Sequence, residues 1–124
     1  MPVIVGVAIG GAIGASCRWL LDRFIEARSD AIFPWSTFTI NVTGCLVIGV
    51  VIEQLVDRHY LPAWIRVGLV VGVLGGYTTF STFSQEIFSL LESNDIAIAL
   101  AYAGASVGMG LLAVYAGTVL GRAF

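Results

Sequence analysis

The residues with usable chemistry lie inside apolar stretches of the chain, where polar side chains are scarce. They comprise an amide, several hydroxyls and two phenyl rings: Asn41, Thr37, Ser81, Thr82, Ser106, Phe80 and Phe83. Amides and hydroxyls donate hydrogen bonds, and a phenyl ring has a positive edge. Such groups can hold a small anion without a fixed positive charge that would trap it. No nucleophile with its base, metal-ligand cluster or phosphate-binding loop stands out, so we predict that the chain is not an enzyme.

A run of weak helix formers interrupts the third apolar stretch. Gly75 and Gly76 are followed by Thr78 and Thr79. Glycine disfavours a helix through backbone entropy, and threonine does so because its stiff side chain competes for backbone hydrogen bonds. Inside a membrane, non-helical backbone persists only where protein or a water-filled cavity covers it. We therefore predict a break that lines an ion site, in which freed carbonyls suit a small cation and exposed N–H groups favour an anion.

The composition is that of an integral membrane protein. Of the 124 residues, 58% are hydrophobic and only 11% are charged, against about 25% charged in an average soluble domain. At roughly 20 residues per span, we predict one all-α domain over 1–124. Its four transmembrane helices are expected at about 3–25, 36–55, 62–91 and 96–120, with the third broken near its middle, at 75–79. The first half of that helix should end near Gly75 and Gly76, and the second should begin around Thr79.

The spacing of small and polar residues predicts which helix faces meet. Gly6, Gly10 and Gly14 recur every four residues, so another helix can approach closely along this face. The face leads to Arg18, for which two interpretations remain: an interfacial anchor whose head reaches water, or a buried cation with a partner such as Asp22.

Two further stripes carry polar groups. Thr37, Asn41 and Gly44 share one face of the second helix, where Asn41 faces either a neighbouring helix or a polar path. Tyr102 and Ser106 form a hydroxyl stripe on the fourth helix, for which serine bonding back to its own helix is the alternative. Cys17 and Cys45 are expected to be free thiols.

The charges leave the orientation in the membrane undecided. The net charge is −2 and gives no basic patch for nucleic acid, which we exclude as a partner. All six basic residues are arginines, and the two ends of the bundle hold similar numbers: Arg58, Arg66 and Arg122 at one end, and Arg23 and Arg28, with Arg18 nearby, at the other. Because Lys/Arg asymmetry sets orientation, this balance leads to the hypothesis that the chain inserts both ways and pairs as an antiparallel dimer.

Three motifs together resemble the Fluc/CrcB family of bacterial fluoride channels over essentially the whole chain. They are Gly10-Gly11-Ala12-Ile13-Gly14-Ala15 with Arg18, Thr37 with Asn41 and Gly44, and Gly75-Gly76-Tyr77-Thr78-Thr79-Phe80-Ser81-Thr82-Phe83-Ser84. The resemblance implies a multi-pass protein of the bacterial plasma (inner) membrane. It further implies a dual-topology homodimer with two antiparallel pores, which exports fluoride passively and so reduces its toxicity.

The resemblance also implies roles for individual residues. Asn41, Phe80 and Phe83 are expected in the fluoride pore with Thr37, Ser81, Thr82, Tyr102 and Ser106, while Gly110 stands where this polar track would continue with serine. Backbone carbonyls of Gly75 and Thr78 are expected to bind a structural sodium ion at the dimer centre. Arg18, Gly76 and Thr79 are expected to be structural.

Two other functions compete with this interpretation. A small four-helix proton-coupled multidrug exporter would need a carboxylate within the membrane, and Glu86, near a helix end, is the candidate. The favoured interpretation of Glu86 is instead a carboxylate in a solvated vestibule. A non-transporting scaffold would explain the glycines, but it would leave Asn41 and the break without a role.

Overall fold

The computed structural model describes residues 1–56 and 61–124, and the regular elements in these ranges are helices. The first span is α1 (Val3–Glu26), the second is α2 (Trp35–Val56) and the fourth is α6 (Ile96–Arg122). The third is composite: α3 (Ala63–Val67), the π-helix η1 (Gly68–Leu74), α4 (Gly75–Tyr77) and α5 (Ser81–Glu92). All four spans are long and apolar enough to cross a membrane. The predicted all-α membrane fold is thereby confirmed; Arg58, used in the charge comparison, lies outside the described residues.

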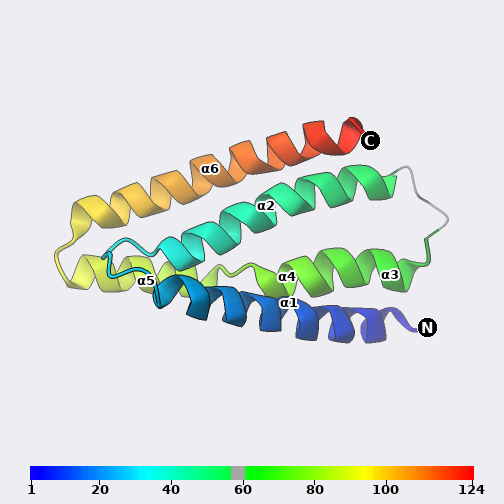
Figure 1. The fold of residues 1–124 in the computed structure, drawn as a ribbon, viewed down its shortest axis with the longest axis horizontal. Helices are drawn as coiled ribbons and strands as arrows, with labels where there is room; N and C mark the ends of the chain where they lie inside the picture. The colour runs from blue at the N-terminus through cyan, green and yellow to red at the C-terminus, as the bar shows by residue number, and fades with distance from the viewer. Residues whose placement is uncertain (57–60) are drawn as a thin grey trace.

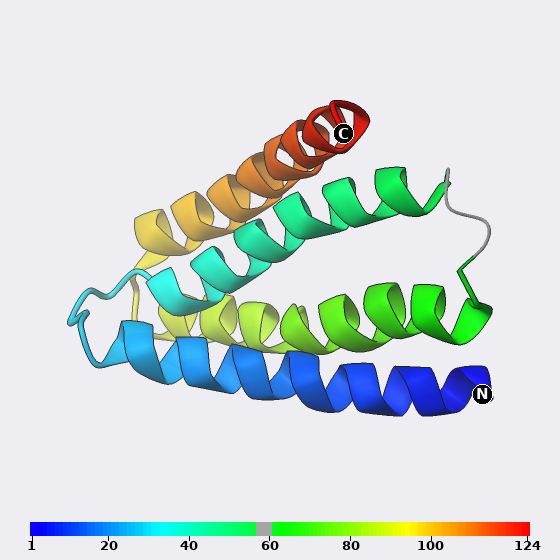
Figure 2. The same ribbon diagram turned by 45° about the vertical axis from the view of Figure 1, so that its right-hand side comes forward.

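The spans form two adjacent pairs. Helix α1 runs along the first half of the third span, and α2 runs along α6 (Figures 1 and 2). Both termini lie at one end of the bundle, and the turn from α5 to α6 lies at the other (Figure 1). The break between α4 and α5 therefore falls near the middle of the bundle, beside α2.

The glycine face of α1 packs directly on the third span. Gly6, Gly10 and Gly14 are buried, and a Cβ added at any of them would collide with a backbone carbonyl of the third span, at Trp64, Gly68 and Val73 respectively. Backbone therefore meets backbone along the whole contact, as the four-residue spacing predicted. This close approach is what lets side chains of α1 reach the break.

The π-helical turns of η1 were not predicted. Gly68 and Gly72 both pack on α1. A Cβ added at Gly76, four residues further, would lie 3.0 Å from the Gly11 oxygen of α1. Four-residue spacing drifts around an α-helix of about 3.6 residues per turn. The wider π turns offset that drift, and the three glycines stay on one face.

The break begins later than predicted. Gly75 and Gly76 are helical, and the chain leaves the helix only at Thr78, which is extended with ψ 158°. The first half-helix therefore ends at Tyr77, one residue beyond the two glycines near which it was expected to end, and the second begins at Ser81, two residues beyond Thr79. The physical reason is packing: Gly76 lies against the backbone of α1, and this contact outweighs the weak helix propensity of glycine.

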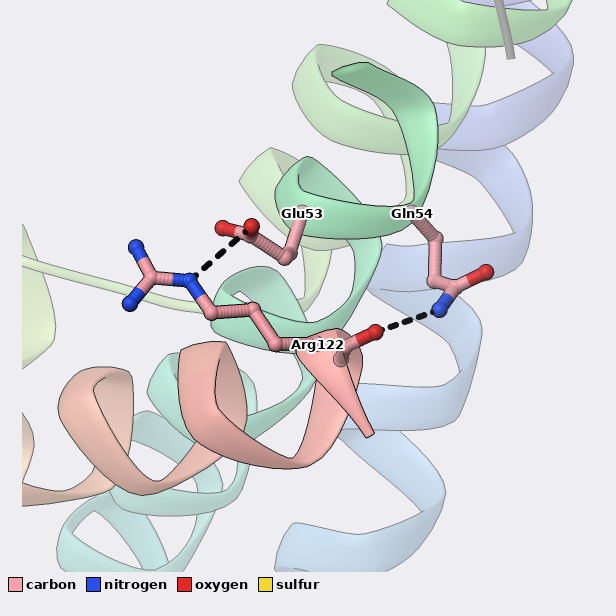
Figure 3. Close-up of polar contacts among 4 residues, drawn as sticks. Glu53, Gln54 and Arg122 are labelled. Carbon is pink, nitrogen blue, oxygen red and sulfur yellow. Dashed lines mark hydrogen bonds and ion pairs between the residues drawn. The ribbon is translucent and has the colours of Figure 1, made fainter. Parts of the chain in front are cut away.

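Helices α2 and α6 also meet through glycines. A Cβ at Gly49 would collide with the Val114 oxygen, and a Cβ at Gly117 would collide with the Leu46 oxygen. At the terminal end, Glu53 and Gln54 of α2 bind the last turn of α6, as Figure 3 shows. The Gln54 amide donates to the Gly121 oxygen over 2.6 Å, and Arg122 pairs with Glu53 over 3.0 Å. The amide bond satisfies a carbonyl that the end of α6 would otherwise leave free.

The turn from α5 to α6 is a Schellman motif. Asn94 has a positive φ of 60°, the Asp95 N–H donates to the Leu90 oxygen, and the Asn94 N–H donates to the Leu91 oxygen. Asp95 then precedes α6 without a side-chain capping bond. This turn packs α5 on α6 around Leu90, Ala99 and the fully buried Tyr102.

Replacing Gly14 by alanine should destabilise the protein, because the new methyl would meet the Val73 carbonyl and neither backbone can yield cheaply. We expect a loss of about 1–3 kcal/mol, seen as a lower midpoint of thermal unfolding for the purified protein in detergent. Gly11→Ala, on the same helix with nothing within 4 Å of the added Cβ, is the matched control. Equal midpoints for the two variants would contradict the proposed packing.

Candidate functional site

Asn41 pairs with the backbone of the break from the side. Its Nδ2 donates to the Thr79 oxygen over 2.9 Å, and its Oδ1 accepts the Thr79 N–H over 2.9 Å. One planar amide thus satisfies both backbone groups of a residue that has left the helix. Asn41 thus makes hydrogen bonds to a neighbouring span, as one of its two interpretations predicted. It also lines a cavity, described below.

Arg18 reaches the same break from α1. Its Nε donates to the Gly76 oxygen over 3.1 Å, so it caps the end of α4 with a positive charge. Asp22, the partner considered from the sequence, instead accepts a hydrogen bond from Ser36 on α2. Arg18 is thus a partly buried cation with a partner, as one of the two interpretations held, but that partner is the Gly76 oxygen and not Asp22.

Thr79 caps the second half-helix with its hydroxyl. The Thr82 N–H donates to Thr79 Oγ1 over 3.2 Å. In a continuous helix that N–H would bind the Thr78 oxygen, and the Thr79 N–H, now bound to Asn41, would bind the Gly75 oxygen. In the described parts of the chain, neither of these two oxygens accepts a backbone hydrogen bond. The break therefore frees the same two carbonyls to which the resemblance assigned a cation.

Local bonds hold the remaining polar groups around the break. Thr78 Oγ1 bonds back to the Leu74 oxygen over 3.0 Å, and its methyl lies where a Cβ on Gly44 would stand. Gly44 thus gives α2 the room to pass the break. Thr43 joins Tyr77 across this contact, hydroxyl to hydroxyl, over 2.8 Å. The Thr43–Tyr77 bond joins residues 34 apart in the chain and was not predicted from the sequence.

A cavity of about 380 Å³ opens at the break. Asn41, Phe80, Phe83 and Ser106 line it, together with Gly75, Thr78, Thr79, Gly44, Cys45 and apolar side chains. None of these lining side chains carries a formal charge. Polarity comes from the amide, the hydroxyls and the carbonyls, within a largely apolar wall.

Two residues in the wall of this cavity have unusual surroundings. The Phe80 side chain is 78% exposed although it belongs to the wall, and its ring lies 6.0 Å from that of Phe83. Ser106 Oγ is buried without a hydrogen-bond partner in the described ranges, so the back-bonding alternative for this serine was wrong. A buried hydroxyl without a partner is costly, and it is free to bind a ligand.

A second, more polar cavity of about 540 Å³ lies at the end where α5 turns into α6. Its walls include Glu26, Ser36, Gln85, Glu86 and Asp95. The Tyr102 hydroxyl, 3.4 Å from Glu86 Oε1, points toward this side, and the Thr37 hydroxyl lies beside both groups. The Tyr102 ring packs edge-on against Phe83, at 5.1 Å and 64°. Tyr102 and Phe83 thus form a layer between the two cavities.

The predicted site residues therefore fall into three groups. Asn41, Phe80, Phe83 and Ser106 gather at the first cavity with the carbonyls of Gly75 and Thr78. Thr37 and Tyr102 lie in the layer next to Glu86, both buried. Ser81 and Thr82 occupy the exposed first turn of α5, outside either cavity wall. A pore role for any of them stays a prediction.

The capping role of Thr79 could have been found from the sequence. Threonine is a preferred N-cap residue whose hydroxyl accepts the N–H of a residue two or three positions further on, and Thr79 precedes the apolar second half of the third span. Glu86 was interpreted as a carboxylate in a solvated vestibule or as an exporter carboxylate, and it lines the second cavity; its bond to Tyr102 was not predicted. Its proximity to Tyr102 is a contact between α5 and α6, and no local pattern signals it.

The fold and the site define a multi-pass membrane protein with a hydrogen-bonded break inside one span and an uncharged cavity beside it. Residues 5–118 match the family described as "CrcB-like protein, Camphor Resistance (CrcB)". The chain belongs to this bacterial membrane protein family.

Relatives with the name "Fluoride-specific ion channel FluC" match along almost their whole length. The protein of Rhizobium meliloti (strain 1021) is 44% identical, over 99% of this chain and 98% of its own. That of Chloroflexus aurantiacus (strain ATCC 29366 / DSM 635 / J-10-fl) is 44% identical over 100% and 98%. The more distant protein of Flavobacterium psychrophilum is 38% identical over 98% of both chains.

Removing the Arg18 guanidinium should weaken the break, because the Gly76 oxygen would lose its donor. We expect Arg18→Met to cost about 1–3 kcal/mol, measured as a lower thermal midpoint in detergent. Arg23→Met is the matched control: Arg23 lies on the same helix with its guanidinium 6.0 Å from the Trp19 ring, away from the break. An unchanged midpoint for Arg18→Met would exclude a structural role for the Arg18–Gly76 bond.

Proposed function

We propose that this chain is a fluoride-selective channel that exports fluoride passively across the bacterial plasma membrane and so reduces cytoplasmic fluoride toxicity. The observation that carries the proposal is the uncharged cavity at the break, with the Asn41 amide, the unpartnered Ser106 hydroxyl and two phenyl rings in its wall. Hydrogen-bond donors and ring edges attract a small anion, and the absence of a formal positive charge in that wall lets it leave. The names and full-length match of the relatives support fluoride as the ion.

The proposed path connects the two cavities. An anion would enter from the second cavity, pass the Tyr102 and Thr37 hydroxyls and the Phe83 ring, and reach Ser106 and Asn41. Asn41 uses one N–H on Thr79, and its second N–H remains available because an amide carries two. At the start of this path, the Tyr102 hydroxyl donates its hydrogen bond to the Glu86 carboxylate. While it does so, this hydroxyl cannot donate to the anion.

The functional unit in this proposal is an antiparallel homodimer with two pores. The first cavity is open along a face where Phe80 is exposed, and a second copy of the chain would supply the missing wall. The exposed α6 side chains Leu100, Leu111 and Tyr115 offer further apolar area for lipid or for a second copy. Near-equal arginine counts at the two ends fit insertion in both orientations.

A sodium ion bound to the carbonyls of Gly75 and Thr78 would join the two copies at the dimer centre. The fit is favourable, because both oxygens lack backbone donors and both residues line the cavity. Carbonyl oxygens are suitable ligands for a small hard cation. Within the described residues no cluster of His, Cys, Asp or Glu side chains offers a competing metal site. When bound, the ion would supply fixed positive charge at the dimer axis.

The competing functions account for fewer of these features. A proton-coupled exporter of cationic drugs would need a carboxylate in its binding site, whereas Glu86 lies in the wall of the second cavity and bonds to Tyr102. A scaffold would not require an unpartnered hydroxyl in an uncharged cavity. An enzymatic role is not part of this proposal.

Efflux from liposomes tests the function. Vesicles containing the purified protein and loaded with potassium fluoride should release fluoride to an external fluoride electrode when valinomycin balances the charge. Chloride-loaded vesicles, followed with a chloride electrode, should release little. Absence of fluoride release, or equal release of chloride, would reject a fluoride-selective channel.

Asn41→Asp should abolish fluoride efflux, because it puts a negative charge in the cavity wall and replaces the N–H donors with an acceptor. Asn94→Asp is the matched control: it makes the same change in the turn between α5 and α6, at a position with φ 60° that aspartate tolerates. The control should keep its efflux. Wild-type efflux from an assembled Asn41→Asp protein would remove Asn41 from the anion path.

Dual insertion has its own test. A C-terminal cysteine, placed in a variant with Cys17 and Cys45 replaced by serine, should be labelled by an impermeant maleimide from both sides of the membrane in comparable amounts. Labelling from one side only would exclude the antiparallel dimer while leaving fluoride transport open.

A further inference from the structure

Three spans contribute hydrogen bonds to the break. Two of the side chains involved, Asn41 and Thr79, do more than satisfy its backbone hydrogen bonds. We infer that Asn41 and Thr79 are positioning residues for a cation: each takes away the N–H that would otherwise hold the carbonyl of Gly75 or Thr78 within a helix. The inference rests on the sodium ion of the proposed function. It gives Asn41 a second role, separate from any contact with the anion.

Asn41 acts on Gly75. In a helix that continued through the break, the Thr79 N–H would donate to the Gly75 oxygen four residues earlier. That N–H instead donates to Asn41 Oδ1 over 2.9 Å, while Asn41 Nδ2 holds the Thr79 oxygen over 2.9 Å. Because both bonds come from one rigid amide, the Thr79 peptide group is fixed in position and orientation. The Gly75 oxygen is left without a backbone donor, and Gly75 lines the cavity.

Thr79 acts on Thr78 in the same way. The Thr82 N–H, the helical donor for the Thr78 oxygen, donates to Thr79 Oγ1 over 3.2 Å. The ψ of 158° at Thr78 turns its carbonyl away from the helix direction. The Thr78 hydroxyl donates to the Leu74 oxygen, so it does not donate to the Thr78 oxygen. The two exchanges of partner together leave two oxygens without backbone donors, and they belong to residues, three apart in sequence, that line one cavity.

These roles depend on geometry and not on charge, because Asn41 and Thr79 are neutral. A variant that restores helical hydrogen bonding should therefore weaken cation binding, even if the substituted side chain never touches the ion. The aliphatic isostere Thr79→Val removes the acceptor of the Thr82 N–H, which can then return to the Thr78 oxygen. Asn41→Ala frees the Thr79 N–H to return to Gly75.

The test measures sodium binding through stability and needs no transport. Thermal unfolding of the purified dimer is followed in detergent while sodium replaces N-methyl-D-glucamine at constant ionic strength. Ligand binding to the folded state raises the midpoint, so the wild-type midpoint should rise with sodium. Asn41→Ala and Thr79→Val should each need about tenfold more sodium for the same rise, which corresponds to roughly 1.4 kcal/mol lost from binding.

Two matched variants separate positioning from general damage. Thr79→Ser keeps the hydroxyl and should retain the wild-type sodium dependence. Ser106→Ala changes the wall of the same cavity without touching the break backbone, so it should reduce fluoride efflux and leave the sodium dependence unchanged. If Asn41→Ala does not fold, the comparison of Thr79→Val with Thr79→Ser decides the result alone.

Each outcome has a distinct meaning. A sodium-dependent wild type with an equally sodium-dependent Thr79→Val would overturn the positioning role and leave the proposed sodium site intact. A wild type whose midpoint ignores sodium would reject the sodium ion and this inference together. Fluoride efflux from liposomes would still report on the channel itself.

Discussion

The constraint on which this structure depends is that a broken helix inside a membrane must find partners for its backbone without water. The break spans only Thr78 to Phe80 between two helical segments, yet it engages Arg18 from α1, Asn41 from α2 and Thr79 from within the third span. An unsatisfied peptide group in hydrocarbon would cost several kcal/mol. Supplying these partners therefore fixes how three segments of the bundle lie relative to one another.

Glycine packing is the condition that makes this possible. Gly6, Gly10 and Gly14 bring the backbone of α1 against that of the third span, so the Arg18 guanidinium reaches the Gly76 carbonyl. Gly44 does the equivalent on α2, where the methyl of Thr78 occupies the space of a missing Cβ. The small residues thus set the distances, and the polar residues then use them.

In the proposed channel, the same break would serve ions of both signs. Side chains take over the N–H groups, which leaves the Gly75 and Thr78 oxygens without backbone donors, and these residues line one cavity together with an amide, a hydroxyl and two phenyl rings. In the proposed channel a cation would remain at the carbonyls and the anion would pass beside it. No arginine or lysine side chain lines the cavity, so no side chain in its wall would hold the anion by a full positive charge.

The sequence by itself determined the four spans to within two residues at each end, because the length of an apolar stretch is a local property. It also identified the glycine face of α1 and, of the pore side chains it predicted, Asn41, Phe80, Phe83 and Ser106 do line the cavity. Only the tertiary structure decided where the break starts, since Gly76 packs against α1 and the helix continues to Tyr77. It likewise decided that Arg18 binds Gly76 and not Asp22, and that Asn41 binds both backbone groups of Thr79. These outcomes depend on which backbone atoms of neighbouring helices come within hydrogen-bonding distance, and no spacing along one helix contains that information.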